Sequence, residues 1–409
     1  MSRLNLYKFV NFYHNNNLKG WVNMQISERV KNVSPSLTLA ITSRAKQMKK
    51  DGLDVVGFGA GEPDFDTPDY IKEAAKKAIS DGFTKYTPVT GMIELKKAVC
   101  DKFKNENNLV YSTDEVAVSC GAKHSLFNYF QVALNPGDEV LVPVPYWVSY
   151  PQQVILAGGK PVFVETDKRN QFKVTAELLE KYVTPKTKAI ILNSPSNPSG
   201  VMYTESELKE LAEFFVKKNL PVVSDEIYEH ITYEVFHKSI ASFGDEIKKL
   251  TVVVNGVSKA FSMTGWRIGY LAADKEIIKG INKIQGHSTS NPSSISQIAS
   301  ISALEGGLSF VKKMVEEFKA RRDYIVARLN SMDGISCPTP QGAFYVYPDI
   351  SSFGIGSIAF CEKLLEQSHV AFVPGIAFGN DTNVRLSYAI SKEAIEKGLD
   401  RFENHIKNL

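Results

Sequence analysis

The chain has 409 residues, of which 43% are hydrophobic and 23% are charged, and its formal net charge is +3. This composition is typical of a folded globular protein and excludes a largely disordered one. Its length exceeds one ordinary hydrophobic core, so we expect two domains. The lysines are interspersed with glutamates and form no basic stripe, and no apolar run reaches the about 18 residues of a membrane-spanning helix. We therefore expect neither nucleic acid nor a membrane as a partner.

Cysteine usage indicates the redox environment. The four cysteines, Cys100, Cys120, Cys337 and Cys361, include no CxxC pair and do not have the spacing of a zinc site. We therefore expect free thiols in a reducing compartment, the cytoplasm, and no bound metal.

Residues 1–23 differ from the rest of the chain. They contain several asparagines and aromatic residues and no acidic residue. Their apolar stretch is too broken for a secretory signal, and they have fewer arginines and serines than a transit peptide. We expect a poorly ordered leader that precedes a fold beginning near residue 24.

Short apolar runs alternate with helical or loop segments from about residue 115 to residue 272. They are rich in Val and Ile, as are strands of a mostly parallel sheet that helices cover on both faces. Seven runs therefore predict one large α/β domain with a seven-stranded sheet. The runs are residues 115–119, 139–144, 161–165, 189–193, 220–224, 250–255 and 267–272.

Ligands of such sheets bind beyond the carboxyl ends of the strands. We therefore expect the residues that follow the runs to gather at one edge of the sheet. Five runs lead into polar, aromatic or glycine residues, namely Gly121-Ala122-Lys123, Trp147, Asn197, Asp225 and Ser258-Lys259.

The C-terminal part has a different pattern. A long helical pattern over residues 310–331 leads into predicted strands at 343–347 and 383–388 and predicted helices at 358–367 and 392–406. This order predicts a smaller α+β domain built from residues 24–70 and 310–409, beside a large cofactor-binding domain over residues 71–309. Residues 59–63 are expected to cross between the two.

Lys259 and Arg267 carry the clearest chemical signal. Lys259 lies just past an apolar run, and Arg267 follows eight residues later. A buried lysine beside cationic groups has a lowered pKa, so its amine can form a Schiff base with a carbonyl cofactor and can later transfer a proton. An arginine can hold a phosphate through two parallel hydrogen bonds. Together they indicate pyridoxal phosphate.

Other residues meet the remaining demands of that cofactor. Asp225 can keep the pyridine nitrogen protonated, although an aspartate after a strand also commonly caps the next helix. Tyr228 can face the same ring. Backbone N–H groups of residues 121–123, at a helix start, favour an anion, and Ser258 adds a hydroxyl. Asn197 either contacts the cofactor or only forms its proline-bracketed turn.

Two further side chains fit a substrate. Trp147 either stacks on the cofactor ring and donates its N–H to a carboxylate, or lies in the core. Arg385 lies on a predicted strand, on the face opposite Val384 and Leu386. Its planar fork fits a substrate α-carboxylate, and the alternative is a structural salt bridge.

At this point the chain resembles the class I/II pyridoxal-phosphate-dependent aminotransferases of fold type I, and among them the bacterial-type aspartate aminotransferases. The similarity runs from about residue 26 to the C-terminus. It is carried by these segments: Ala60-Gly61-Glu62-Pro63-Asp64-Phe65-Asp66-Thr67-Pro68, Lys85-Tyr86-Thr87-Pro88, Pro145-Tyr146-Trp147-Val148-Ser149-Tyr150, Asn193-Ser194-Pro195-Ser196-Asn197-Pro198-Ser199-Gly200, Ser224-Asp225-Glu226-Ile227-Tyr228, the Lys259 segment with Ser258 and Arg267, and Val384-Arg385-Leu386-Ser387-Tyr388.

The resemblance implies roles for these residues. Lys259 would bind the cofactor covalently, Asp225 would pair with its ring nitrogen, and Tyr228 would bind its phenolic oxygen O3′. The residues implied to contact the phosphate, O3′ or the substrate are Gly121, Ala122, Lys123, Trp147, Asn197, Ser258, Arg267, Gly61 and Arg385. Tyr86 would reach the phosphate of the neighbouring subunit, which implies a homodimer with shared active sites.

The resemblance also implies a substrate class. A lysine at the position of Lys123 is associated with the distal carboxylate of dicarboxylic substrates, and Ser36 and Thr38 would line the same region. This favours ping-pong transfer of an amino group between L-aspartate and 2-oxoglutarate. Relatives that use prephenate tend to carry a lysine where this chain has Ser34, which weakens the prephenate hypothesis. Transamination of aromatic amino acids and a lyase reaction on the same fold stay open as hypotheses. Gly256 replaces a serine of some branches and leaves fewer side-chain donors for the phosphate.

Overall fold

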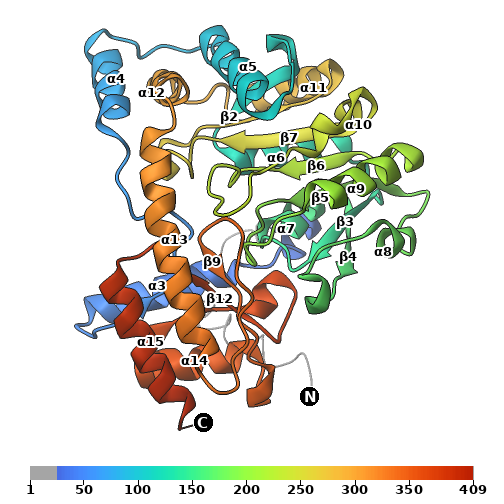
Figure 1. Cartoon of the computed structure of the whole chain (residues 1–409). Coiled ribbons are helices and arrows are strands. Elements are labelled where there is room, and N and C mark those ends of the chain that lie inside the picture. The colour runs from blue at the N-terminus through green and yellow to red at the C-terminus, as the bar shows by residue number, and fades with distance from the viewer. Residues whose placement is uncertain (1–24, 409) are drawn as a thin grey trace, which may run out of the picture.

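The computed structural model describes residues 25–408, and the predicted leader over residues 1–23 lies outside the described residues. A large sheet with helices on both faces forms one part of the described chain, and a smaller group of helices and short strands forms the other (Figure 1). The long helix α13 (Ser309–Asn330) runs between the two parts. Among the described residues no helix is both long and apolar enough to cross a membrane.

The predicted seven-stranded sheet is confirmed. Each predicted run contains a strand, with ends that differ by at most two residues. The strands in spatial order are β2 (Val116–Ser119), β8 (Gly269–Ala272), β7 (Thr251–Gly256), β6 (Val222–Asp225), β5 (Thr187–Asn193), β3 (Glu139–Val144) and β4 (Lys160–Glu165). Only β8 is antiparallel to its two neighbours, β2 and β7.

Burial explains why these strands are apolar. Every residue of β2, β6, β7 and β8 is buried. Alternate residues of β2 face opposite layers, because Val116 and Val118 pack against α5 (Ile93–Asn107) whereas Ala117 packs against α6 (Ala122–Ala133). Strand β4 lies at the sheet edge and exposes Lys160 and Phe163. The sheet is thus a middle layer with helices on both sides.

The remaining elements of the large part cover the sheet faces or lie beside them. They are α4 (Asp69–Ser80), α7 (Ser149–Leu156), α8 (Ala176–Glu180), α9 (Glu205–Lys218), α10 (Asp245–Leu250), α11 (Lys275–Gly286) and α12 (Ser294–Glu305).

The smaller part combines residues from both ends of the described chain. Its elements are α2 (Glu28–Lys31), α3 (Leu37–Lys50), β1 (Val56–Gly57), β9 (Tyr345–Val346), α14 (Ser357–Ser368), β10 (Val370–Ala371), β11 (Val373–Pro374), β12 (Val384–Ser387) and α15 (Lys392–Ile406). Strand β1 pairs with β10, and β12 pairs with β11 and β9. Phe58 packs edge-on against Phe372, which packs against Phe402. This shared core supports our proposal that residues 24–70 and 310–409 form one domain and residues 71–309 another.

The reversed direction of β8 positions the site. Gly269, the first residue of β8, lies opposite both Ser119 and Gly256, the last residues of β2 and β7. The segment that enters β8 therefore lies at the edge where its neighbours end. In the same way Asn193 and Asp225 are paired at the ends of β5 and β6. Residues from five separate segments therefore meet at one edge.

Candidate active site

Lys259 lies in the turn after β7, and its amine donates a hydrogen bond to the carbonyl oxygen of Gly61. The side chain is partly open to the site but lies deep among protein atoms, and this burial lowers its pKa to about 8. The charge of Glu62 opposes the shift, whereas Arg385 and Arg267 add to it. A larger share of the amine is therefore neutral, and nucleophilic, than for a lysine in water.

Asp225 ends β6 and is buried, with 4% of its surface exposed. Its Oδ2 accepts a 2.7 Å hydrogen bond from the Tyr150 hydroxyl, and its Oδ1 accepts one of 3.3 Å from the Ile227 N–H. Burial raises the pKa of Asp225 to about 6, although the Tyr150 hydrogen bond opposes the shift. A turn follows the strand, so the helix-capping alternative is not supported.

Tyr150 is a site residue to which sequence reasoning assigned no role. It lies on α7, three residues after Trp147, and its ring packs edge-on against that indole at 5.3 Å. Trp147 precedes α7, so the helical period of α7 does not relate the two residues. Only the fold brings Tyr150 to Asp225, which is 75 residues away in the sequence.

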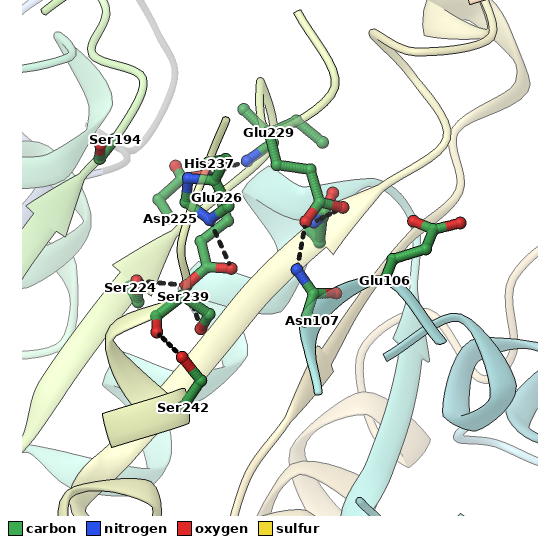
Figure 2. Close-up of polar contacts among 12 residues, drawn as sticks. Glu106, Asn107, Ser194, Ser224, Asp225, Glu226, Glu229, His237, Ser239 and Ser242 are labelled. Atoms are coloured by element: carbon green, nitrogen blue, oxygen red, sulfur yellow. Dashed lines mark hydrogen bonds and ion pairs between the residues drawn. The ribbon is translucent and has the colours of Figure 1, made fainter. Parts of the chain in front are cut away.

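A polar brace behind Asp225 holds its two chain neighbours (Figure 2). One carboxylate oxygen of Glu226 accepts hydrogen bonds of 2.7 Å from the hydroxyls of Ser224 and Ser239. The other lies 3.0 Å from Nε2 of His237. Successive strand residues point to opposite faces, so the brace fixes the backbone from the face away from the Asp225 side chain.

Glu229 extends this cluster and has the spacing of a metal ligand with Glu226 and His237. Its carboxylate, however, already accepts hydrogen bonds from the amine of Lys102 and from Asn107 and Asn255. Burial alone would raise the pKa of Glu229, but Lys102 holds it below the usual value. A cation would have to displace the Lys102 ammonium group, so we assign the cluster a structural role.

The start of α6 and Arg267 form an anion cradle. Gly121 caps α6 with a φ of 92°, and a Cβ atom there would lie 2.3 Å from Nη2 of Arg267. The guanidinium is held by the carbonyl oxygens of Thr264 and Cys120, at 2.8 and 3.2 Å. The first N–H groups of α6 have no partner within the helix, so they are available to an anion.

Glycines at the strand ends make this cradle possible. A Cβ atom on Gly269 would lie 2.0 Å from the Ala122 nitrogen, so only glycine lets α6 begin this close to β8. A Cβ atom on Gly256 would lie 3.0 Å from Cα of Gly269. The absence of a serine at position 256 therefore has a packing reason. Ser258 is buried directly before Lys259.

Arg385 is a buried cation without an acidic partner among residues 25–408, so the alternative of a structural salt bridge is not supported there. Its Nη1 donates to Oδ1 of Asn197 and its Nη2 to the carbonyl oxygen of Gly59, both at 3.0 Å. Its Nε is buried and has no hydrogen-bond partner in the described chain. Asn197 thus contacts Arg385, besides donating its own backbone N–H to Asn193. A buried, unpaired guanidinium is suited to a carboxylate ligand.

Lys123 and Trp147 are in contact with each other. The Lys123 amine is 4.9 Å from the Trp147 ring centre, and burial followed by the charge of Arg267 lowers its pKa. Trp147 packs partly against the core but is only half-buried, and it lines one pocket with Tyr150 and Asn197, whereas Lys123 is exposed. Both predicted positions are therefore open to a ligand.

Three further residues were predicted to contact a ligand, namely Ser36, Thr38 and Tyr86. The Ser36 hydroxyl caps α3, and the Thr38 hydroxyl is buried without a partner in the described chain. Their segment is near α7, because Gln152 accepts a hydrogen bond from the Ser34 N–H. Their contact with a substrate stays a prediction. Tyr86 is 90% exposed, as a residue that reaches another subunit would be.

The assembled groups fit pyridoxal phosphate. Lys259 supplies an amine for the aldehyde, Asp225 a buried acid for the ring nitrogen, and Tyr228 a buried hydroxyl 2.8 Å from that of Tyr345. The cradle of Arg267 and the start of α6 supplies donors for the phosphate. These donor types are the ones that the cofactor's functional groups require.

The raised pKa of Asp225 predicts that the free energy of unfolding of the cofactor-free protein depends on pH. Its carboxyl group titrates near pH 6 when folded and near its ordinary value of 3.8 when unfolded, so stability falls as pH rises through that window. We expect the D225N variant, which cannot ionise, to gain stability relative to wild type by roughly 2 kcal/mol between pH 4 and pH 7.

Urea unfolding of both cofactor-free proteins across this pH range measures the difference. The D101N variant, which changes an exposed aspartate, is the control and should differ from wild type by the same amount at every pH. If the difference in unfolding free energy between D225N and wild type does not change with pH, Asp225 is not a buried carboxyl group whose ionisation destabilises the fold.

Comparison with known proteins agrees with this geometry. The sequence profile of the family "Aminotransferase class I and II" matches residues 53–402. The chain is 48% identical to the aspartate aminotransferase of Bacillus subtilis, over 94% of this chain and 99% of the relative. It is also 48% identical to a probable aspartate/prephenate aminotransferase of Rickettsia conorii, over 93% and 98%. The solved aspartate aminotransferase of Thermus thermophilus with maleate superposes with a TM-score of 0.90 at 43% identity, over 93% and 99%. The chain therefore belongs to the class I and II aminotransferase family.

Proposed function

We propose that the protein transfers an amino group between L-aspartate and 2-oxoglutarate, in two half-reactions linked by pyridoxal phosphate. The observation that carries this proposal is a pair of cations, each of which contacts a residue that lines the same pocket. Arg385 contacts Asn197, Lys123 contacts Trp147, and both contacted residues line that pocket. Two cations suit the two carboxylates of aspartate. The relatives named aspartate aminotransferases support the same substrate.

Each residue of the site has a separate role in the proposed reaction. When bound, pyridoxal phosphate supplies an electron sink that stabilises negative charge at the substrate Cα. Asp225 holds a proton at the ring nitrogen, and Tyr150 keeps its carboxylate in place. Arg385 binds the α-carboxylate. The Lys259 amine, with its lowered pKa, would remove the proton from the substrate Cα and, as the conjugate acid, would return a proton later in the same half-reaction.

The assembly and location are also proposals. We propose a homodimer in which Tyr86 contributes to the partner's phosphate site, supported by the 90% exposure of this aromatic residue. We propose a reducing compartment such as the cytoplasm, supported by the four unpaired cysteines. No observation in this chain favours prephenate, an aromatic amino acid or a lyase reaction over aspartate.

The direct test of the function is turnover. Purified protein with pyridoxal phosphate should convert aspartate and 2-oxoglutarate into oxaloacetate and glutamate, detected by coupling oxaloacetate to NADH oxidation. The K259A variant should show no turnover and no visible absorbance band of bound cofactor. Ammonia and pyruvate from a β-substituted amino acid, without oxaloacetate formation, would instead establish a lyase.

Lys123 is expected to make the enzyme prefer dicarboxylic over monocarboxylic amino acids. Its amine would meet the distal carboxylate, so K123A should lower kcat/KM for aspartate by about 10- to 100-fold, since one charge-assisted hydrogen bond is worth about 1.5–3 kcal/mol. The kcat/KM for alanine, which has no distal carboxylate, should change by less than about 3-fold. Equal losses for both amino acids would contradict the assigned role.

A further inference from the structure

Tyr345 links the two ends of the site and has been given no role so far. It is fully buried on β9, and its hydroxyl lies 2.8 Å from that of Tyr228. Its ring centre lies 4.5 Å from the guanidinium carbon of Arg385. One side chain thus contacts both the predicted O3′ ligand and the predicted carboxylate ligand.

Strand register explains the contact with Arg385. Tyr345 pairs with Ser387 across β9 and β12, and Arg385 lies two residues before Ser387, on the same face of the sheet. Diagonal neighbours of this kind are within reach of aromatic and long side chains. The guanidinium therefore lies over the Tyr345 ring on one side, and 5.1 Å from the Phe378 ring on the other.

Of the two O–H groups of these phenols, only one is used in the hydrogen bond between them. Tyr228 and Tyr345 together have two O–H groups, and one of them lies between the two oxygens. No other acceptor among residues 25–408 is within hydrogen-bond distance of either oxygen, although both side chains are buried. If Tyr345 donates to Tyr228, the Tyr228 hydrogen is free for an acceptor in the site, such as O3′ of the cofactor.

The Tyr345 hydroxyl also lies near Gly61, the residue that accepts the hydrogen bond of Lys259. A Cβ atom on Gly61 would lie 3.5 Å from that hydroxyl, and the Gly61 carbonyl oxygen accepts the hydrogen bond of Lys259. The Tyr228 ring centre is itself 5.7 Å from the Lys259 amine, so the pair of phenols lies near the amine that would bond to the cofactor.

We propose that Tyr345 is a positioning residue with two separable actions: its hydroxyl orients Tyr228 as a donor to the cofactor, and its ring holds Arg385 for the substrate carboxylate. This rests on the proposed function in so far as it concerns the substrate. A phenylalanine at this position would keep the ring and remove only the hydroxyl, whereas a leucine would remove both. The two actions can therefore be tested apart.

The test uses the full chain with the cofactor removed and titrated back, followed by tryptophan fluorescence. We expect Y345F to raise the Kd of pyridoxal phosphate by about 3- to 10-fold, the loss of one buried hydrogen bond. The inhibition constant of maleate, a dicarboxylate, should change by less than about 2-fold in Y345F and rise by at least about 3-fold in Y345L, because only the leucine removes the cation–π contact.

A double variant and a control separate positioning from general damage. Y228F/Y345F should bind pyridoxal phosphate no more weakly than Y228F alone, because the Tyr345 hydroxyl acts through Tyr228. Y388F removes a comparable buried hydroxyl, which donates to the Ala343 carbonyl oxygen at 3.1 Å, and should change neither constant.

An unchanged cofactor Kd in Y345F, additive losses in the double variant, or equal maleate effects in Y345F and Y345L would each overturn the proposal. The cofactor titration needs no turnover. A wild-type protein that binds pyridoxal phosphate but does not transaminate aspartate would therefore overturn the proposed function and leave the role of the Tyr345 hydroxyl standing.

Discussion

The reversal of one strand in an otherwise parallel sheet is the constraint on which the site depends. Because β8 runs against β2 and β7, its first residue, Gly269, meets the last residues of both neighbours. The loop that carries Arg267 is thereby brought to the edge where the other strands deliver Lys259 and the start of α6. Glycine at position 269 is part of the same constraint, since any side chain there would push the helix start away. The position of the proposed phosphate site and that of the reactive amine therefore both depend on how β8 packs between β2 and β7.

Burial then sets the chemistry of the groups that meet there. It lowers the pKa of the Lys259 amine to about 8 and raises that of the Asp225 carboxyl to about 6. Each group is made less charged than it would be in water, so each gains from a ligand that supplies the missing partner. The buried Arg385 follows the same logic, because it has hydrogen-bond acceptors but no counter-charge in the described chain. The protein's own residues therefore favour a ligand whose charges complement these three groups.

Sequence patterns predicted the sheet, and the strand ends at which most residues of the candidate site lie, for a physical reason. Strands buried on both faces must be apolar, so their ends, and with them Asp225 and Lys259, could be located from composition alone. The direction of β8 could not be predicted from the sequence, since an apolar run has the same pattern in either orientation. Tyr150 and Tyr345 were given no role because their partners are distant in sequence, although Tyr345 lies within a strand that the sequence predicts. The domain boundaries and the contacts of Ser36 and Thr38 stay predictions.

The central claim is that the Lys259 amine is the group that bonds to the cofactor. Borohydride reduction of the protein loaded with pyridoxal phosphate makes that bond permanent, and peptide mass spectrometry then identifies the labelled lysine. We predict one phosphopyridoxyl group per chain, on the peptide that contains Lys259. A label on Lys123 or any other lysine, with Lys259 unmodified, would contradict the account.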